Sequence, residues 1–311
     1  MAGIINVSSL TKQFKDVKAV DNLSFTVNQS DVYGFLGQNG AGKSTTIRML
    51  LTLIEPSGGE IEMFGLNLRT HRKEILRQVG AIIERPDLYK YLSGYENLHL
   101  FAKMNGVDSS RKKLMEQLEL VGLADRANSK AKTYSQGMKQ RLGIAIALVH
   151  DPQLVILDEP TNGLDPQGIA DMRNLILHLS RHLKKTVMVS SHLLSEIEQV
   201  ATRMLIIDKG KKIVEGAVEE LIDPAKTMVS LEPTDLSFAV DYIQNSKWNA
   251  FLIKPVFDNI LLQIHREQIP ELNHDLVYAG VGVLSLQAKN SLENYFLQIT
   301  AGKQYVGNFT D

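Results

Sequence analysis

A glycine-crowded stretch, GQNGAGKST at residues 37–45, follows a short apolar run and precedes a helix-forming run. Its spacing is G-x-x-x-x-G-K-S, and it ends in Lys43 and Ser44. Glycines without Cβ atoms let backbone N–H groups crowd around the phosphates of a nucleotide, while the helix N-terminus and Lys43 add positive charge. The Ser44 hydroxyl is a candidate ligand for Mg²⁺. The predicted nucleotide-binding residues of this loop are Gly37, Gln38, Asn39, Gly40, Ala41, Gly42, Lys43, Ser44 and Thr45.

Short apolar runs alternate with helical stretches over the first two thirds of the chain. The runs are residues 32–37, 154–158, 186–191 and 204–208, and the clearest helices are 136–149 and 168–182. This alternation predicts an α/β fold with a mostly parallel sheet that is covered on both faces. Residues 4–10 and 18–27 have no helix between them and predict a small antiparallel sheet. Residues 95–128 are helical in pattern and predict a helical insertion.

The pattern changes near residue 222 and predicts a second domain. A strand at 227–231, a helix at 236–245, two strands joined at Asp258 and Asn259, a second helix and a strand at 281–288 follow. This β-α-β-β-α-β order resembles a ferredoxin-like α+β module. We expect a nucleotide-binding domain at residues 1–222, with its helical subdomain at about 95–150, and an accessory domain at 223–311.

Composition limits the partners. The chain has 34 Lys and Arg against 35 Asp and Glu, so no global positive field predicts nucleic acid as a partner. It has no cysteine, which fits a reducing cytoplasm. We find no signal-peptide pattern and no run of about 20 apolar residues, the length that a spanning helix needs. We therefore expect a cytoplasmic chain whose membrane role, if any, depends on a partner.

Two acids end the apolar run LVILD, and they are candidates for the chemistry. The carboxyl end of a buried parallel strand lies at the phosphate side of such a sheet. Asp158 is therefore predicted to hold Mg²⁺ through water, and Glu159 to act as general base on an attacking water. The alternative is an ordinary acidic turn.

The stretch YSQGMKQRLGIAIAL, residues 134–148, offers a second helix N-terminus. Ser135 and Gly137 open this helix, and its free N–H groups are able to hold a phosphate. A serine-capped helix without a ligand explains the local pattern equally well.

Together these segments resemble the ATP-binding cassette (ABC) ATPases, which are P-loop NTPases. The family's signature corresponds to residues 134–138, its D-loop to TNGLD at 161–165, and its switch histidine to His192. The resemblance covers residues 4–221. It implies that ATP and Mg²⁺ are bound between two head-to-tail copies, because this chain has a single phosphate loop.

The resemblance also implies roles for single residues. Ser135 and Gly137 act across the dimer, Asp165 crosses the seam, and His192 touches the γ-phosphate. Without the resemblance, His192 reads as an ordinary surface residue. Phe14 takes the place of the family's adenine-stacking aromatic residue, with a core phenylalanine of the small sheet as the alternative.

Glu84 departs from the family pattern, which has a magnesium-sensing glutamine facing the membrane subunit. A carboxylate there strengthens metal binding but repels the γ-phosphate. This departure is similar to ATPases of bacitracin and lantibiotic exporters. We hypothesise that Glu84 couples nucleotide state to a permease helix received by Tyr89, Tyr91 and Tyr95, although these tyrosines pack equally well within the helical insertion.

The resemblance therefore implies the ATPase subunit of an ABC exporter, peripheral on the cytoplasmic face of the membrane and bound to integral permease subunits. A soluble cassette ATPase acting on ribosomes or chromosomes is the alternative, but a second cassette and long coiled coils are absent. The chain has no N-K-x-D motif, the base-reading motif that would indicate a GTPase. Residues 291–302 resemble a closing helix of such exporter cassettes, and the second domain's role stays open between bracing, regulation and dimerisation.

Overall fold

The computed structural model describes residues 3–221, 227–256 and 259–289. The chain divides into two compact units, Met1–Ala217 and Val218–Asp311. The predicted domain boundary at 222, the turn residue Asp258 and the predicted closing helix at 291–302 lie outside the described residues. Among the described helices, none is long and apolar enough to cross a membrane.

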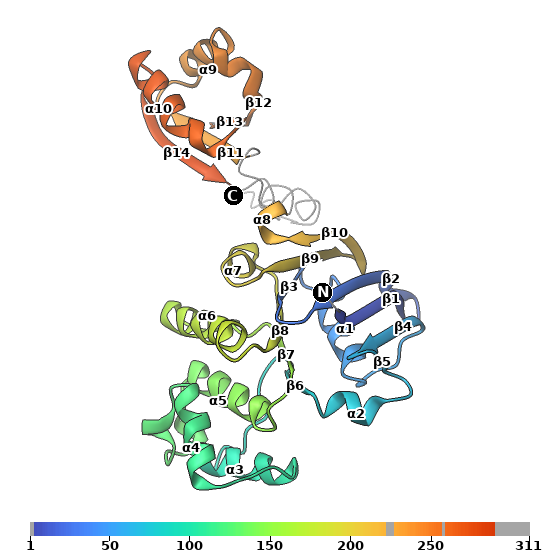
Figure 1. Cartoon of the computed structure of the whole chain (residues 1–311). Coiled ribbons are helices and arrows are strands. Elements are labelled where there is room, and N and C mark those ends of the chain that lie inside the picture. Colours follow the sequence, from blue (N-terminus) through green and yellow to red (C-terminus); the bar gives the residue numbers. More distant parts are fainter. Residues whose placement is uncertain (1–2, 222–226, 257–258, 290–311) are drawn as a thin grey trace, which may run out of the picture. The chain divides into compact units, whose positions relative to one another are not determined.

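The first unit is built around a six-stranded sheet in the order β10-β9-β3-β8-β7-β6 (Figure 1). Its strands are β3 (Val32–Leu36), β6 (Val79–Ile82), β7 (Leu154–Asp158), β8 (Thr186–Ser191), β9 (Arg203–Asp208) and β10 (Lys211–Ala217). Neighbouring strands are parallel except β10, which pairs antiparallel with β9. Every residue of β3, β7 and β8 is buried, as expected where helices cover a parallel sheet. The predicted mostly parallel sheet is confirmed.

Helices cover both faces of this sheet. Helices α6 (Pro166–Arg181) and α7 (Leu194–Glu198) lie on the side opposite α1 (Lys43–Leu50), and α2 (Arg72–Leu76) precedes β6 (Figure 1). The predicted helix at 168–182 begins two residues earlier, because Asp165 caps it and Pro166 occupies its first turn.

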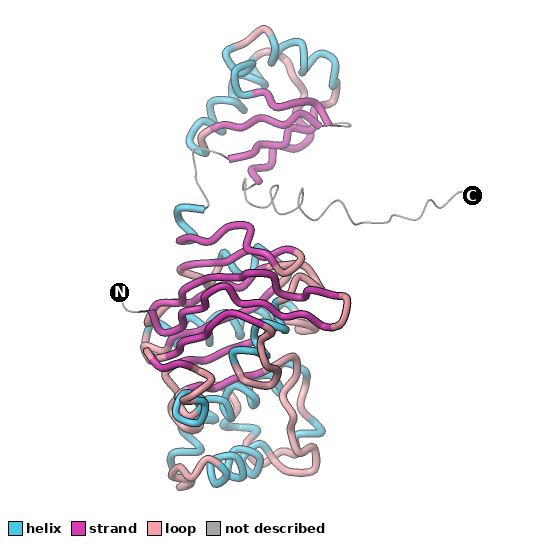
Figure 2. The backbone as a smooth tube through the Cα atoms, turned by 90° about the vertical axis from the view of Figure 1, so that its right-hand side faces the viewer, coloured by secondary structure: helices cyan, strands magenta, loops and turns pink. Residues whose placement is uncertain are grey.

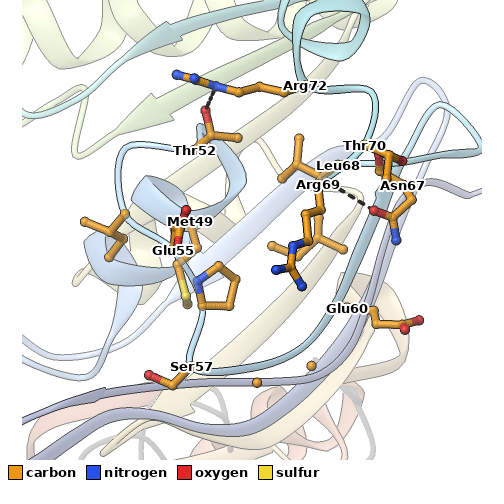
Figure 3. A pocket seen from close by; sticks show the side chains of 15 residues that line it. Met49, Thr52, Glu55, Ser57, Glu60, Asn67, Leu68, Arg69, Thr70 and Arg72 are labelled. Carbon is orange, nitrogen blue, oxygen red and sulfur yellow. Dashed lines mark hydrogen bonds between the residues drawn. The ribbon is translucent and has the colours of Figure 1, made fainter.

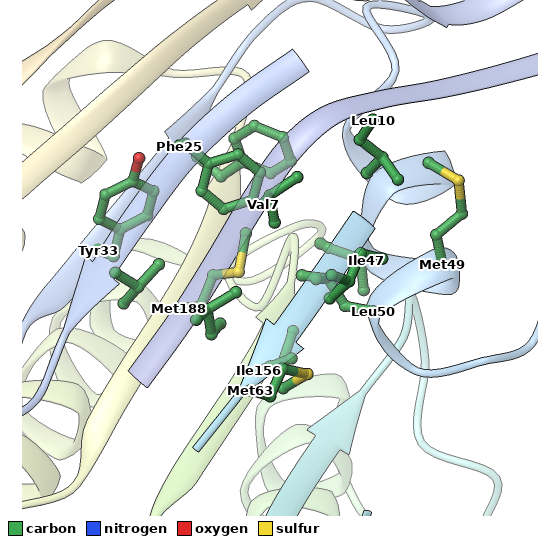
Figure 4. Close-up of a cluster of buried hydrophobic side chains, with 14 of the residues drawn as sticks. Val7, Leu10, Phe25, Tyr33, Ile47, Met49, Leu50, Met63, Ile156 and Met188 are labelled. Atoms are coloured by element: carbon green, nitrogen blue, oxygen red, sulfur yellow. The ribbon is translucent and has the colours of Figure 1, made fainter. Parts of the chain in front are cut away.

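The antiparallel sheet that residues 4–10 and 18–27 predict is present, has four strands and packs against α1. Strands β1 (Gly3–Phe14), β2 (Val17–Asn28), β4 (Gly58–Met63) and β5 (Leu66–Asn67) form the order β2-β1-β4-β5. The pairs β1–β2, β1–β4 and β4–β5 are antiparallel. The core of the unit lies between this sheet, α1 and the central sheet, where Phe25, Ile47, Ile156 and Met188 pack together (Figure 4). This core holds the phosphate loop at a defined place above the central strands.

The region of the predicted helical subdomain, at about 95–150, contains α3 (Gly94–Met104), α4 (Arg111–Leu120) and α5 (Gln136–Leu148), with short 3-10 turns at Ala124–Arg126 and Ala131–Thr133. Helix α3 starts with a capping box, in which Ser93 and Glu96 exchange hydrogen bonds with each other's backbone N–H. Tyr134, next to the start of α5, is 3% exposed and donates its hydroxyl to Arg126 O at 2.7 Å. The tyrosine therefore fixes where α5 begins.

The second unit contains α8 (Val218–Leu221), β11 (Thr227–Pro233), α9 (Leu236–Gln244), a 3-10 turn (Lys247–Phe251), β12 (Leu252–Val256), β13 (Asn259–Ile264), a 3-10 turn (Arg266–Gln268), α10 (Ile269–Tyr278) and β14 (Val283–Lys289). Its antiparallel sheet has the order β12-β13-β11-β14, and α9 and α10 lie on one face (Figure 2). Trp248 is fully buried in a core that belongs to this unit alone. The β-α-β-β-α-β order and the two central strands β11 and β13 are those of a ferredoxin-like fold.

Candidate active site

The glycine-crowded stretch at residues 37–45, the glycine loop, runs from the end of β3 into the first turn of α1. Gly42 is the N-cap of α1 and has a left-handed φ of 107°. A Cβ atom there would lie 2.5 Å from Ala19 O, and one on Gly37 would lie 2.6 Å from Ile207 O. Among the described residues no side chain caps the first turn of α1, which leaves its N–H groups available to an external anion. The loop is therefore built for close backbone approach to phosphate oxygens.

Lys43 is the cation of the loop, and only 5% of its side chain is exposed. Its Nζ donates to Gly37 O at 2.6 Å and lies 3.1 Å from Glu159 Oε1. A buried ammonium needs an opposite charge, and Glu159 supplies it in this structure. A phosphate in the loop would provide the same compensation.

Asp158 is fully buried at the end of β7. Its Oδ1 accepts the Ser190 hydroxyl at 2.5 Å, whereas Oδ2 has no hydrogen-bond partner among the residues that the structure describes. A buried carboxylate oxygen without a donor costs free energy unless a cation or water satisfies it. Its chemistry therefore fits a hard divalent cation such as Mg²⁺.

Glu159 lies between two basic side chains. Its Oε2 is 2.8 Å from His192 Nδ1, and its Oε1 faces Lys43. Because a carboxylate only accepts, the His192 Nδ1 carries the proton of this hydrogen bond. The Glu159 backbone has a left-handed φ of 50°, and its N–H donates to Ser190 Oγ at 2.9 Å. The carboxylate thus lies next to the glycine loop, in contact with its cation.

The structure thus brings Lys43 and His192 into direct contact with Glu159, and Asp158 is the preceding residue of the chain. Ser135 and Asp165 stand apart from them as exposed N-caps, the first of α5 and the second of α6. Ser135 Oγ accepts the Met138 N–H at 3.2 Å, and Asp165 Oδ1 accepts the Gly168 N–H at 2.9 Å. Both therefore cap their helices, and their roles across a dimer stay predictions.

Phe14 ends β1 and is 46% exposed, so it is not a core residue. Lys12 Nζ lies 5.0 Å from the centroid of its ring. The exposed ring face is available for a planar ligand such as adenine.

Comparison with known proteins decides the family. A family model described as ABC transporter matches residues 20–162. The bacitracin transport ATP-binding protein BcrA of Bacillus licheniformis is 43% identical over 304 residues, which span 97% of this chain and 99% of that protein. The chain belongs to the ATP-binding proteins of ABC transporters.

Other relatives agree with this family. The lantibiotic transport ATP-binding protein SrtF of Streptococcus pyogenes is 41% identical over 212 residues, 68% of this chain and 90% of that protein. The structure of cbiO1 from Clostridium perfringens, part of the ABC transporter complex cbiONQ, has a TM-score of 0.66 at 25% identity. It covers 71% of this chain and 90% of its own, and it confirms the predicted P-loop cassette fold. The chain is accordingly an ATPase, and the glycine loop with its neighbours is the candidate ATP site.

Glu84 of this ABC ATPase follows β6 and has a left-handed φ of 57°. Its Oε1 accepts a hydrogen bond from Arg48 Nη2, on α1, at 2.7 Å. Of the neighbouring tyrosines, Tyr91 is 80% and Tyr89 53% exposed, whereas Tyr95 stacks on His99 within α3. The predicted exposed aromatic surface therefore consists of two tyrosines.

Sequence reasoning missed Ser190 and Arg48 in this ABC ATPase. Ser190 links the Asp158 side chain to the Glu159 backbone. The sequence did carry a sign of this role, because a serine inside a fully buried strand needs a hydrogen-bond partner. Arg48 had no such signal, because its hydrogen bond to Glu84 joins α1 to a segment 36 positions further along the chain.

A hollow of about 670 Å³ lies elsewhere in the first unit, between the end of α1 and strands β4 and β5 (Figure 3). Arg72 Nε donates to Thr52 Oγ1 there at 2.6 Å, and the Arg69 N–H donates to Asn67 Oδ1 at 3.0 Å. None of the predicted site residues lines this hollow. It is therefore separate from the candidate ATP site.

Proposed function

We propose that this ATPase powers a membrane exporter, with ATP and Mg²⁺ bound between two head-to-tail copies of the chain. The observation that carries the proposal is the Glu159 carboxylate, held 2.8 Å from His192 Nδ1 and 3.1 Å from Lys43 Nζ beside the glycine loop. The arrangement combines a base, a phosphate-binding cation and a histidine able to sense the γ-phosphate.

In the proposed site, the glycine loop and Lys43 bind the β- and γ-phosphates. Ser44 and the unpartnered Oδ2 of Asp158 hold Mg²⁺ directly or through water. The ion neutralises phosphate charge when it is bound. Glu84 is a further candidate for contact with Mg²⁺ or its water.

Glu159 is proposed to take a proton from the attacking water. In this structure its Oε1 lies 3.1 Å from Lys43 Nζ, so one carboxylate oxygen is engaged by the ammonium group. Phosphate binding draws the Lys43 ammonium towards the nucleotide, because the phosphates carry more negative charge than one carboxylate. The base is thereby released when its substrate arrives.

The proposed dimer completes the γ-phosphate cage. One glycine loop leaves part of the γ-phosphate solvated, and the exposed start of α5 at Ser135 and Gly137 offers further N–H donors. The donors come from a second copy, with Asp165 at the seam. Phe14 stacks on adenine.

The proposed cargo follows from the relatives named for bacitracin and lantibiotic transport. We propose peptide-antibiotic export by a complex with integral permease subunits, and a position on the cytoplasmic face of the membrane. Purification from detergent-solubilised membranes, followed by mass spectrometry, identifies the permease. Recovery without any integral membrane protein would contradict this part of the proposal.

The test of the site is Glu159→Gln. This variant keeps ATP binding, loses turnover and accumulates an ATP-bound dimer, measured by equilibrium binding, phosphate release and light scattering. Glu116→Gln, on the exposed face of α4, is the matched control and keeps normal turnover. Normal turnover in Glu159→Gln would refute the base, and a persistent monomer with ATP would refute the dimer.

A further inference from the structure

Two hydroxyl groups converge on one carboxylate oxygen beside the candidate ATP site. Glu196 lies in α7, and its Oε2 accepts hydrogen bonds from Thr161 Oγ1 at 2.8 Å and from Ser191 Oγ at 2.7 Å. Thr161 follows Glu159 by two residues, and Ser191 directly precedes His192. One side chain therefore joins the segment after the base to the segment that carries the histidine.

The Ser191 hydroxyl holds the backbone on both sides of His192. Ser191 is 1% exposed and gives its only hydroxyl proton to Glu196. Its oxygen also accepts the Leu193 N–H at 3.0 Å. The residues on both sides of His192 are thus held by the Ser191 hydroxyl, and the hydrogen bond to Glu196 sets the orientation of that hydroxyl.

Thr161 makes corresponding contacts in the segment that follows Glu159. Its hydroxyl donates to Glu196, and its carbonyl oxygen accepts the Leu164 N–H at 3.1 Å, which closes the turn before Asp165. The Asn162 N–H donates back to Glu159 O at 3.2 Å. The position of Thr161 therefore affects both the base and the loop that leads to Asp165.

The contacts form a closed ring. It runs from Glu159 along the chain to Thr161, across to Glu196 and Ser191, on to His192, and back to Glu159 through the 2.8 Å hydrogen bond. We infer that Glu196 is a positioning residue for ATP hydrolysis, which sets the distance between the Glu159 carboxylate and the His192 ring. The inference rests on the roles proposed above for Glu159 and His192.

The surroundings favour protein hydrogen bonds over water at Glu196. A cavity of about 20 Å³ adjoins it, with room for roughly one water molecule. Most of its lining is apolar, from Ile169, Ile176, Ile197 and Val200. Hydrogen bonds to a carboxylate are strong where little water competes, so loss of one hydroxyl shifts the segment it held.

The first test is Thr161→Val in the full-length chain, which removes the hydroxyl but keeps the shape. We expect kcat for ATP to fall about tenfold, equivalent to about 1.4 kcal/mol of barrier, while KM changes by less than about twofold. The split is expected because the phosphate loop is untouched and only the alignment of base and histidine changes. Thr161→Ser restores the hydroxyl and most of kcat.

A double-mutant cycle tests whether the contact with Glu196 is responsible. Thr161→Val and Glu196→Leu each lower kcat, and the double variant is no slower than the slower single variant. Ser195→Ala, on the exposed side of the same helix, is the matched control and keeps kcat. Circular dichroism melting checks that all variants are folded.

The inference would be overturned by unchanged kcat in Thr161→Val or by additive losses in the cycle. Thr161→Val and Thr161→Ser with equal losses would also overturn it, since a lost hydroxyl then does not explain the effect. Glu159→Gln in the same assay separates the two proposals. If it stops turnover while Thr161→Val does not, the proposed base stands and the positioning role fails.

Discussion

Arg48 Nη2 lies 2.7 Å from Glu84 Oε1, so the carboxylate that follows β6 is paired with a cation of α1. The two side chains are 42% and 63% exposed, and a pair of this kind contributes no more than about 1 kcal/mol to stability. The importance of this pair is that Arg48 neutralises the charge of the Glu84 carboxylate. An unpaired Glu84 would add repulsion towards a nucleotide that is already strongly negative.

We therefore expect that removal of Arg48 changes the KM for Mg-ATP more than it changes the stability of the fold. We expect Arg48→Met to raise KM for Mg-ATP about threefold or more, because the free carboxylate repels the γ-phosphate. Adding Glu84→Gln to this variant restores KM, and the exposed Arg77→Met is the control. Steady-state ATPase assays decide the matter, and an equal KM in wild type and Arg48→Met would disprove the charge argument.

Phe14 is expected to contribute through its ring alone. Phe14→Ala should weaken ATP binding about tenfold, within the range of about 1–3 kcal/mol for stacking between a base and an aromatic ring, whereas Phe14→Tyr should keep affinity. Inorganic triphosphate has no base, so its affinity should be the same in all three proteins. Titration calorimetry measures these affinities. Equal loss for ATP and triphosphate would show that Phe14 acts on the loop instead.

Gly42 combines a left-handed backbone with close approach to Ala19 O. Gly42→Ala is expected to lose ATP binding and to lower Tm by more than Gly65→Ala. Gly65 has a φ of 75°, and beyond its chain neighbours no described residue has an atom within 4 Å of the place that a Cβ would take, so its substitution costs only backbone strain, about 1–2 kcal/mol. Thermal melts and nucleotide titrations compare the pair. Similar Tm values would mean that the close contact is easily relieved.

His150 predicts an acid sensitivity of the fold. Burial lowers the pKa of this histidine below its ordinary value of 6.5, although its hydrogen bond to Val79 O opposes the shift. As pH falls through that ordinary value, the unfolded chain takes up a proton and the folded chain does not, so the free energy of unfolding decreases.

Urea unfolding at about pH 7.5 and pH 5.5 tests this prediction, with the exposed His71 as a control for the half-buried His150. His150→Gln should lose less stability between the two pH values than wild type. His71→Gln should behave as wild type does. A wild-type pH dependence in His150→Gln would assign the effect to other groups.

Local patterns in the sequence were sufficient to predict the glycine loop and most of the fold. Residues 37–42 lie between β3 and α1 in the structure, residues 43–45 form the first turn of α1, and the predicted runs at 154–158 and 186–191 are β7 and β8. Such features depend on backbone sterics and on apolar periodicity over a few residues, which the sequence displays directly. The four-residue strand β6 was not predicted, because so short a run has no clear period.

The contacts between distant segments required the folded chain. Asp158 meets Ser190 across 32 positions, Thr161 meets Glu196 across 35, and Arg48 meets Glu84 across 36. None of these separations reflects a local period, because strand order in the central sheet and the packing of α1 bring the segments together. Residue types in the sequence therefore indicate which groups can do the chemistry, whereas the order of the strands determines which of those groups touch.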